Sequence, residues 1–179
     1  MVRKSLLAVF LLLLFAVAAV LAYAATKPDT FRIARTMIIK APAEKIFARV
    51  NDLKGQRDWS TWELKDPAMK RHYSGPDAGK GAVYEWEGNG EIGKGRMEIT
   101  ESTPPTKVVF DMHFIEPFEG RSTAEITLVP AGEMTAVTWA MEGANNYICK
   151  VLTVFIDQDA MIGTEFSASL ARLKTLTEM

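Results

Sequence analysis

The sequence predicts an α+β protein in which a curved antiparallel sheet of about six to seven strands wraps around one long C-terminal helix. Between residues 31 and 141, apolar and polar residues alternate in several short segments, which is the period of strands with one buried face. After residue 146, apolar residues recur at every third or fourth position, as in an amphipathic helix. Because the strands come first and the main helix last, the two kinds of element are segregated along the chain.

An apolar segment precedes the sheet. Arg3 and Lys4 stand directly before an uncharged stretch from Ser5 to Ala25. A helix of about 20 apolar residues is ~30 Å long, which matches the hydrocarbon core of a bilayer. No polar face interrupts the stretch, so a helix lying on the membrane surface is excluded. Residues 1–25 are therefore expected to form a membrane anchor or a signal peptide.

These two fates of the apolar segment both stay open. Ala22 and Ala24 flank Tyr23 in the small-x-small pattern that signal peptidases cleave. The apolar run is longer than the ~7–15 residues typical of signal peptides, which favours a retained single-pass anchor. The leading basic pair favours a cytoplasmic N-terminus and an extracytoplasmic domain, although basic residues between 27 and 40 favour the reverse if they lie outside a folded strand. A secreted or periplasmic protein, cleaved near Ala24, is the alternative.

Residues 26–30 read as a short linker, and residues 31–179 as one domain. The first strand covers residues 31–40, and Pro42 begins a short helix that Asn51 and Gly55 end. Residues 57–62 are expected to form an irregular turn or a second short helix. Glycines and prolines then separate strands at residues 68–73, 82–87, 95–101, 107–115, 124–128 and 137–141. The long helix is expected at residues 146–178.

Composition excludes several classes of function. The net charge is −1 and basic residues do not cluster, so nucleic acid is not an expected partner. The only cysteine is Cys149, so the chain forms no internal disulfide. His72 and His113 lack the spacing of metal ligands, and neither a metal nor a cofactor is expected. No catalytic residue is expected either, because the paired Glu85 and Glu87 alternate onto the solvent face.

Six segments resemble a known family: Ile38–Phe47, Asp58–Ser60, Tyr84–Gly88, Gly95–Ile99, Val137–Gly143 and Asp157–Gly163. Through them, residues 31–178 resemble the START/Bet v1-like superfamily, in particular its polyketide cyclase/dehydrase branch. The resemblance implies a helix-grip fold with an internal pocket for apolar ligands. It implies no reaction, because the family includes lipid and hormone binders as well as aromatase/cyclases and shares no catalytic motif.

The resemblance makes the inward-facing aromatic and methionine residues candidates for the lining of a ligand cavity. From periodicity alone, each of them is better explained as core. The candidates on the sheet are Tyr84, Trp86, Phe110, Met112, Phe114, Trp139 and Met141, and those on the long helix are Phe155, Ile162 and Phe166. Trp59 and Trp62 precede the sheet and form either a lid over the cavity mouth or a cover for the edge of the core.

Asp159 is the most informative polar residue. It falls on the apolar stripe of the helix, where an unpaired buried charge is costly. Arg35 shares the inner face of the first strand with Ile33 and Met37, so it is the expected partner. Asp159 is then either a polar anchor at one end of the pocket or part of a structural ion pair, or Asp157 and Asp159 cap a helix that restarts at this point. The structural interpretation is favoured.

The expected function is binding of an apolar small molecule or lipid by a membrane-tethered domain. A cyclase/dehydratase-type enzyme that uses the same cavity is the first alternative, and a structural or partner-binding module with a filled core is the second. Asp159 and Arg35 are the only inward ionisable groups that the pattern indicates, which favours binding over catalysis. The oligomeric state is left open.

Overall fold

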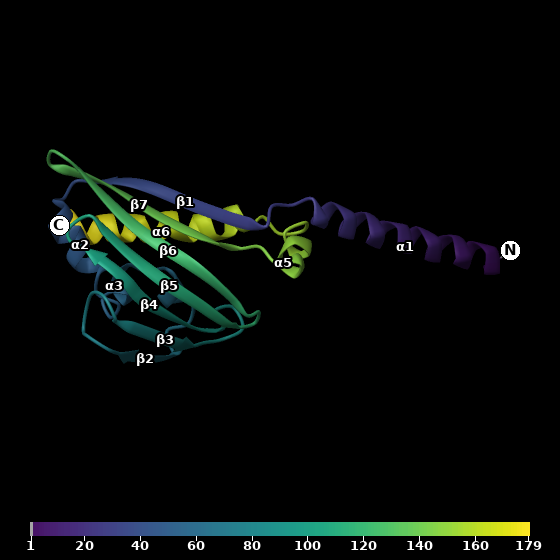
Figure 1. Cartoon of the computed structure of the whole chain (residues 1–179), viewed down its shortest axis with the longest axis horizontal. Coiled ribbons are helices and arrows are strands. Elements are labelled where there is room, and N and C mark those ends of the chain that lie inside the picture. Colours follow the sequence, from purple (N-terminus) through teal and green to yellow (C-terminus); the bar gives the residue numbers. More distant parts are fainter. Residues whose placement is uncertain (1) are drawn as a thin grey trace.

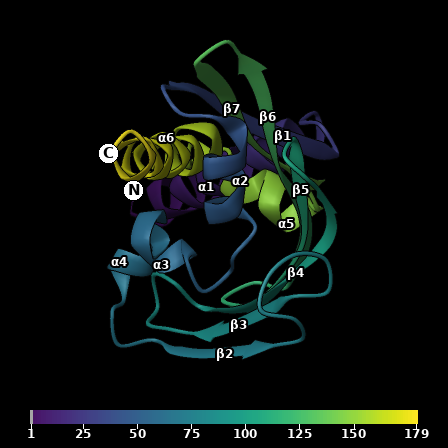
Figure 2. The ribbon, with the colours of Figure 1, turned by 90° about the vertical axis from the view of Figure 1, so that its left-hand side faces the viewer.

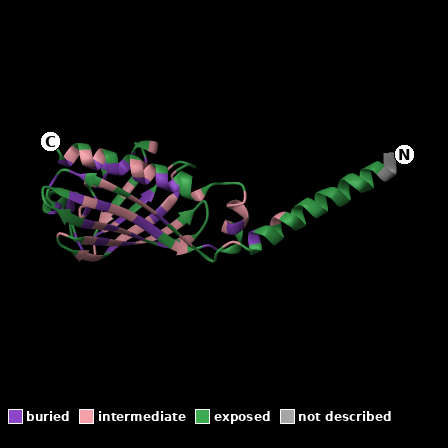
Figure 3. Ribbon diagram, turned by 90° about the horizontal axis from the view of Figure 1, so that it is seen from above, coloured by how far each residue is buried: buried purple, intermediate pink, exposed green. Residues whose placement is uncertain are grey.

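A computed structural model describes residues 2–179, with side chains from residue 5 onward; Met1 and the side chains of Val2, Arg3 and Lys4 lie outside the described part. Helix α1 (Val2–Ala25) extends away from a compact body (Figure 1). From Ser5 onward its side chains are exposed, apart from Val20 and Ala24 (Figure 3). Among the described residues, one helix segment, Ser5–Ala25, is long and apolar enough to cross a membrane.

The body is a seven-stranded antiparallel sheet in the order β1-β7-β6-β5-β4-β3-β2. The sheet curves around the long C-terminal helix α6 (Gln158–Thr177), as Figure 2 shows, which confirms the predicted α+β helix-grip fold. Its strands are β1 (Thr30–Ile39), β2 (Lys70–Ser74), β3 (Val83–Glu87), β4 (Lys94–Thr103), β5 (Lys107–Glu116), β6 (Gly120–Ala131) and β7 (Met134–Ala144).

The strand register puts the alternating apolar residues on one face. One row across the sheet consists of five directly paired residues, which therefore share a face. The row is Ile33, Met141, Ala124, Phe110 and Ile99. All five side chains are buried. The inner face of the sheet is thus the concave side that meets α6.

The predicted C-terminal helix at residues 146–178 is wrong in one respect, because it is two helices. These are α5 (Tyr147–Leu152) and α6 (Gln158–Thr177). The side chains of Asn146 and Asp157 each accept a backbone N–H at the start of one helix, so each segment has its own N-cap. The Asp157 side chain lies just before α6 and bonds the Ala160 N–H. In a continuous helix that N–H would instead bond a backbone carbonyl of the preceding turn. Phe155 consequently lies in the connection and not on α6.

Three short helices cover the rest of the concave side, α2 (Ala43–Val50) beside β6 and α6, and α3 (Gln56–Trp59) and α4 (Trp62–Lys65) toward β2 (Figure 2). The segment expected as an irregular turn or second short helix is thus two single-turn helices. Hydrogen bonds fasten it to α6: the Thr61 amide donates to Ser169 Oγ at 2.9 Å, and the Thr61 hydroxyl donates to Glu165 Oε2 at 2.6 Å.

Candidate ligand-binding site

The candidate site is the space between the concave sheet face, α6 and α3–α4. One face of α6 supplies Ile162, Phe166, Leu170 and Leu173, all buried. Their spacing of four, four and three residues keeps them on one side of the helix. The sheet supplies the predicted inward-facing residues, and the short helices supply Trp59, which is fully buried.

Aromatic rings fill the end of this space beside α6. The rings of Trp139 and Phe166 stack with centroids 4.3 Å apart and planes 8° apart. Trp59 meets the Trp139 ring edge-on at 5.4 Å. Ring pairs in these geometries attract each other beyond the apolar area that they bury. The contacts among these three rings therefore join β7, α6 and α3.

A second aromatic group lines the end of the space under β2 and β3. Tyr73 and Tyr84 stack at 4.9 Å, Tyr84 meets Trp86 at 5.7 Å, and Trp86 meets Phe114 at 6.1 Å. Gly95 lies directly opposite Trp86 in the register and leaves room for the indole to lie across β4. A Cβ at Gly95 would stand 2.3 Å from the Trp86 ring and 2.8 Å from the His113 carbonyl oxygen.

Gly95→Ala is therefore expected to destabilise the protein by about 1–3 kcal/mol, since the added methyl group overpacks a site whose backbone cannot move away. The indole of Trp86 must leave its position, so the tryptophan emission should shift. Chemical denaturation followed by tryptophan fluorescence measures both effects. Gly90→Ala is the control, because a Cβ there meets nothing within 4 Å. Equal stabilities of the two variants would contradict the packing of Trp86 over Gly95.

A buried ionic network lies beside the second aromatic group, and the sequence reasoning missed it. Glu63 Oε2 accepts from Arg71 Nε at 2.8 Å, and Glu63 Oε1 accepts from the Tyr84 hydroxyl at 2.7 Å. The side chains of Glu63 and Arg71 are only 6% and 12% exposed. Arg71 also donates to the carbonyl oxygen of Met69 at 2.7 Å. Both ions are thus paired and hydrogen-bonded, as buried charges must be.

The alternation of outward and inward side chains along β2 could have indicated part of this network. Arg71 and Tyr73 alternate with the exposed His72, which places an arginine on the inner face with a need for a partner. Glu63 could not be predicted as the partner of Arg71, because no sequence pattern set the position of α4. The expectation that Arg35 and Asp159 are the only inward ionisable groups is wrong for this reason.

Burial, and then the hydrogen bond to Glu63, raises the pKa of Tyr84 above its ordinary value. Burial also raises the pKa of Tyr73. Both phenols therefore stay protonated at neutral pH and remain hydrogen-bond donors. The Tyr73 hydroxyl and the indole N–H groups of Trp59 and Trp139 are buried and have no partner within residues 2–179. Buried donors without partners are rare in folded proteins, and an acceptor on a ligand or a water molecule would satisfy these three.

The expected pairing of Arg35 with Asp159 is confirmed. Asp159 Oδ2 and Oδ1 accept from the two terminal nitrogens of Arg35 at 2.8 and 3.1 Å. The guanidinium passes across α6 at Gly163, where an added Cβ would lie 1.9 Å from it. Asp159 is exposed, so it lies at the rim and not among the rings. Asp157, and not Asp159, caps α6.

Asp159→Asn is expected to lower stability slightly at neutral pH, and this effect should shrink as the pH falls below the ordinary pKa of Asp159. The hydrogen bond from Arg35 holds the pKa of Asp159 below the ordinary value of 3.8. A carboxyl with a lowered pKa in the folded state stabilises above its ordinary pKa, and that contribution is lost as the pH falls through the folded-state pKa. Denaturation curves of both proteins between pH 2 and 7 test this. A difference that grows as the pH falls would contradict the pairing.

The structure places the predicted site residues unequally. Trp62, Met112, Phe114 and Trp139 are half-buried, and Trp62 lies on the α4 segment beside Lys65, whose ammonium is 5.4 Å from its ring centroid. Phe155 is 72% exposed and cannot line the interior, so its assignment to the site is wrong. The buried residues within the site are Trp59, Tyr84, Trp86, Phe110, Met141, Ile162 and Phe166.

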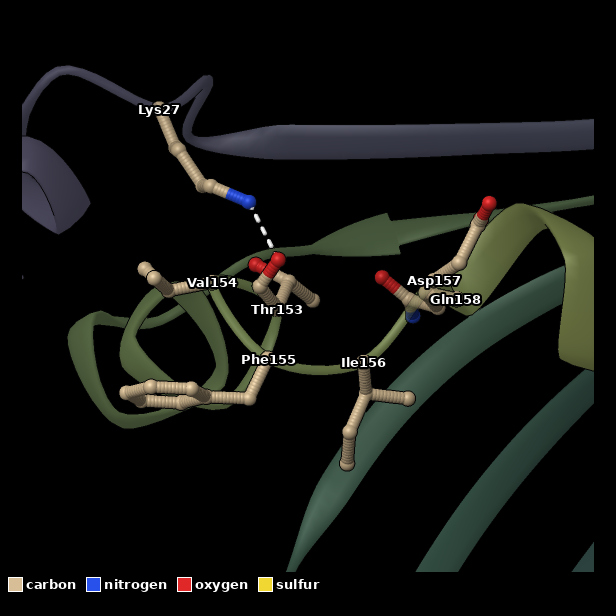
Figure 4. Close-up of a pocket in the computed structure, with 7 residues that line it drawn as sticks. All are labelled: Lys27, Thr153, Val154, Phe155, Ile156, Asp157 and Gln158. Carbon is tan, nitrogen blue, oxygen red and sulfur yellow. Dashed lines mark hydrogen bonds between the residues drawn. The ribbon is translucent and has the colours of Figure 1, made fainter.

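Two pockets open at the surface of the domain. One, of about 450 Å³, is lined by Lys27 and residues 153–158 (Figure 4). The other, of about 190 Å³, includes Tyr73 and Leu53 in its wall. Neither lies between the sheet and α6, where the rings contact one another. A ligand in that space must therefore exchange ring–ring contacts for ring–ligand contacts.

A family model described as polyketide cyclase / dehydrase and lipid transport matches residues 30–178. The chain belongs to this family. Its members share the Bet v1-like fold that the sheet and α6 form here. No curated protein matches the chain.

Solved structures agree with the family's fold. Protein CV1439 from Chromobacterium violaceum is 18% identical with a TM-score of 0.59, covering 86% of this chain and 99% of its own. The Aha1 dimer from Colwellia psychrerythraea is 20% identical with a TM-score of 0.60, covering 83% and 97%. Major latex-like protein 151 from Panax ginseng is 13% identical with a TM-score of 0.56, covering 84% and 99%. At such identities the likeness is one of fold.

Proposed function

We propose that this family member binds an apolar small molecule or a lipid between the sheet and α6, and that α1 tethers it to a membrane. The observation that carries the proposal is the inner face itself, where members of two aromatic groups carry buried donors that lack partners. Ligand sites in proteins are mostly apolar with a few placed polar groups. The family description, which includes lipid transport, supports the same ligand class.

The proposed tether is supported by the composition and exposure of α1. The side chains from Leu6 to Val17 are exposed and apolar, which suits hydrocarbon better than water. The last turn of α1 also contacts the domain: Ala24 is fully buried, and the Leu21 carbonyl accepts from the Tyr147 hydroxyl at 2.9 Å. Cleavage near Ala24 would remove this contact, which favours a retained anchor over a signal peptide.

A cyclase/dehydratase-type enzyme is the second candidate, and Glu63, Arg71 and Tyr84 favour it. They bring ionisable groups to the interior, which a proton-transferring enzyme needs. DynU16, a putative protein in the dynemicin biosynthetic locus, has a related fold at 16% identity and a TM-score of 0.58 over 86% of this chain and 48% of its own. The three groups satisfy one another, however, so binding is the better-supported function.

Quenching by a brominated fatty acid tests the proposed site in the full chain in detergent micelles. All four tryptophans, residues 59, 62, 86 and 139, lie in the domain and none lies in α1. A ligand bound among the rings is expected to quench their emission saturably. Quenching that rises linearly, with the slope found for free N-acetyltryptophanamide in the same micelles, would contradict binding in the interior.

A further inference from the structure

A cluster of exposed apolar side chains lies at the end of the domain where α1 joins it. We call Tyr147, Ile148, Phe155 and Ile156 the α5 surface; they are 48%, 63%, 72% and 47% exposed. They come from α5 and from the connection to α6. Clustered exposed apolar residues mark places where a protein meets a partner or a membrane. Neither the aromatic site nor the proposed tether accounts for them.

Direct contacts fix the position of the α5 surface beside the C-terminal end of α1. Helix α5 packs against α1, and the Tyr147 hydroxyl donates to the Leu21 carbonyl at 2.9 Å. The Lys27 ammonium, just beyond α1, donates to the carbonyl oxygen of Thr153 in the α5–α6 connection. In Figure 1, α5 lies between the sheet and α1. The depth of the surface relative to α1 is therefore set by the fold.

A membrane that contains α1 must then reach the α5 surface. The apolar segment Ser5–Ala25 has 21 residues, so it is about 30 Å long and just fills a hydrocarbon core. Leu21 lies near the end of this segment, at the boundary between hydrocarbon and headgroups. Tyr147, bonded to Leu21, takes the interfacial position where tyrosine is enriched in membrane proteins.

The side chains of the connection point away from the domain's polar contacts. In Figure 4, Phe155 runs to the left and Ile156 downward, and both lie below the connection, on the side opposite Lys27 and its hydrogen bond to Thr153. The pocket that these residues line carries both a cation, Lys27, and an anion, Asp157. One cation and one anion on the same pocket wall give no net charge and so no preference for acidic headgroups. The chemistry therefore fits apolar insertion into a neutral lipid surface better than electrostatic attraction.

We infer that the α5 surface inserts into the headgroup region of the bilayer and holds this end of the domain against the membrane. This inference rests on the tether proposed above. Its occupant is the lipid surface, and zwitterionic phosphatidylcholine suffices. The end of the domain that holds the first residues of β1 and α6 then faces the membrane. The pocket beside Lys27 opens toward the headgroups.

Depth-dependent quenching in the full chain tests the inference. Cys149→Ala removes the only native cysteine, and an environment-sensitive dye is then attached singly at Phe155→Cys, Val129→Cys or Leu12→Cys. Val129 is a matched control, because it is apolar, 61% exposed and on the β6–β7 hairpin at the opposite end of the sheet. The proteins are placed in phosphatidylcholine nanodiscs with plain or brominated acyl chains.

Bromination is expected to reduce emission about twofold or more at positions 12 and 155 and to leave position 129 unchanged. Adding Ile148→Asp and Ile156→Asp should abolish quenching at 155 but not at 12. Quenching at 12 without quenching at 155 overturns the α5 surface and leaves the tether intact. Loss of quenching at 12 shows that the tether itself fails, and the inference falls with it. A dye at 155 that responds to protein concentration instead of bromination shows that a second copy covers the surface, which also overturns it.

Discussion

Glu63→Ala is expected to lower the free energy of unfolding by about 3 kcal/mol, because it leaves the Arg71 guanidinium buried without its counter-ion. The Glu63 side chain is 6% exposed and accepts from both Arg71 and Tyr84 at 2.8 and 2.7 Å. Removing the carboxylate costs these hydrogen bonds and strands a charge. Chemical denaturation of the full chain in micelles, followed by tryptophan emission, measures the loss.

Two further variants separate charge from packing at this network. Tyr84→Phe removes one hydrogen bond to a charged acceptor and should cost about 1.5–3 kcal/mol. The double variant Glu63→Met/Arg71→Met removes both ions and should recover much of the stability lost in Glu63→Ala, since apolar residues of similar volume often replace buried ion pairs without loss. A double variant no more stable than Glu63→Ala would show that the ion pair is not the source of the effect.

Phe166→Ala is expected to cost about 3–5 kcal/mol, since it removes a buried ring and leaves a cavity beside Trp139. Phe166 is 3% exposed and stacks on Trp139 at 4.3 Å. The matched control is Phe155→Ala, which the sequence pattern put on the same helical stripe. Because Phe155 is 72% exposed, its truncation should change stability by less than about 0.5 kcal/mol in micelles.

The same two variants separate the site from the membrane surface. Phe166→Ala should weaken the saturable quenching by a brominated fatty acid, because the ring lines the space that the ligand enters. Phe155→Ala should leave this quenching unchanged and affect only contact with a bilayer. Equal losses of stability from the two truncations would mean that Phe155 is packed in the folded protein, against the division of the C-terminal segment into α5 and α6.

The strands of the fold could be predicted because their faces are encoded locally. Alternation in residues 107–115 put Phe110, Met112 and Phe114 on one side, and the register with β4 and β6 keeps them there. The pairing of Arg35 with Asp159 followed from two charges on faces that had to meet. Such residues are constrained by the period of their own element, which a sequence displays directly.

The remaining features depend on contacts between distant segments. Helical spacing continues through Phe155, so periodicity alone could not show that Asp157 caps a new helix there. The position of Glu63 on the inner side depends on α4, a single turn held to α6 through Thr61 and Glu165. No propensity places so short a helix, because its stability comes from those tertiary hydrogen bonds.

Native mass spectrometry of the full chain, purified in mild detergent from its host membrane, tests most directly whether the interior binds an apolar molecule. Binding predicts a protein peak that carries the mass of one apolar molecule or lipid at a 1:1 ratio, released on unfolding and weakened in Phe166→Ala but retained in Phe155→Ala. A bare protein mass, with no adduct after incubation with total lipid extract, would contradict the account and identify the inner face as a filled core.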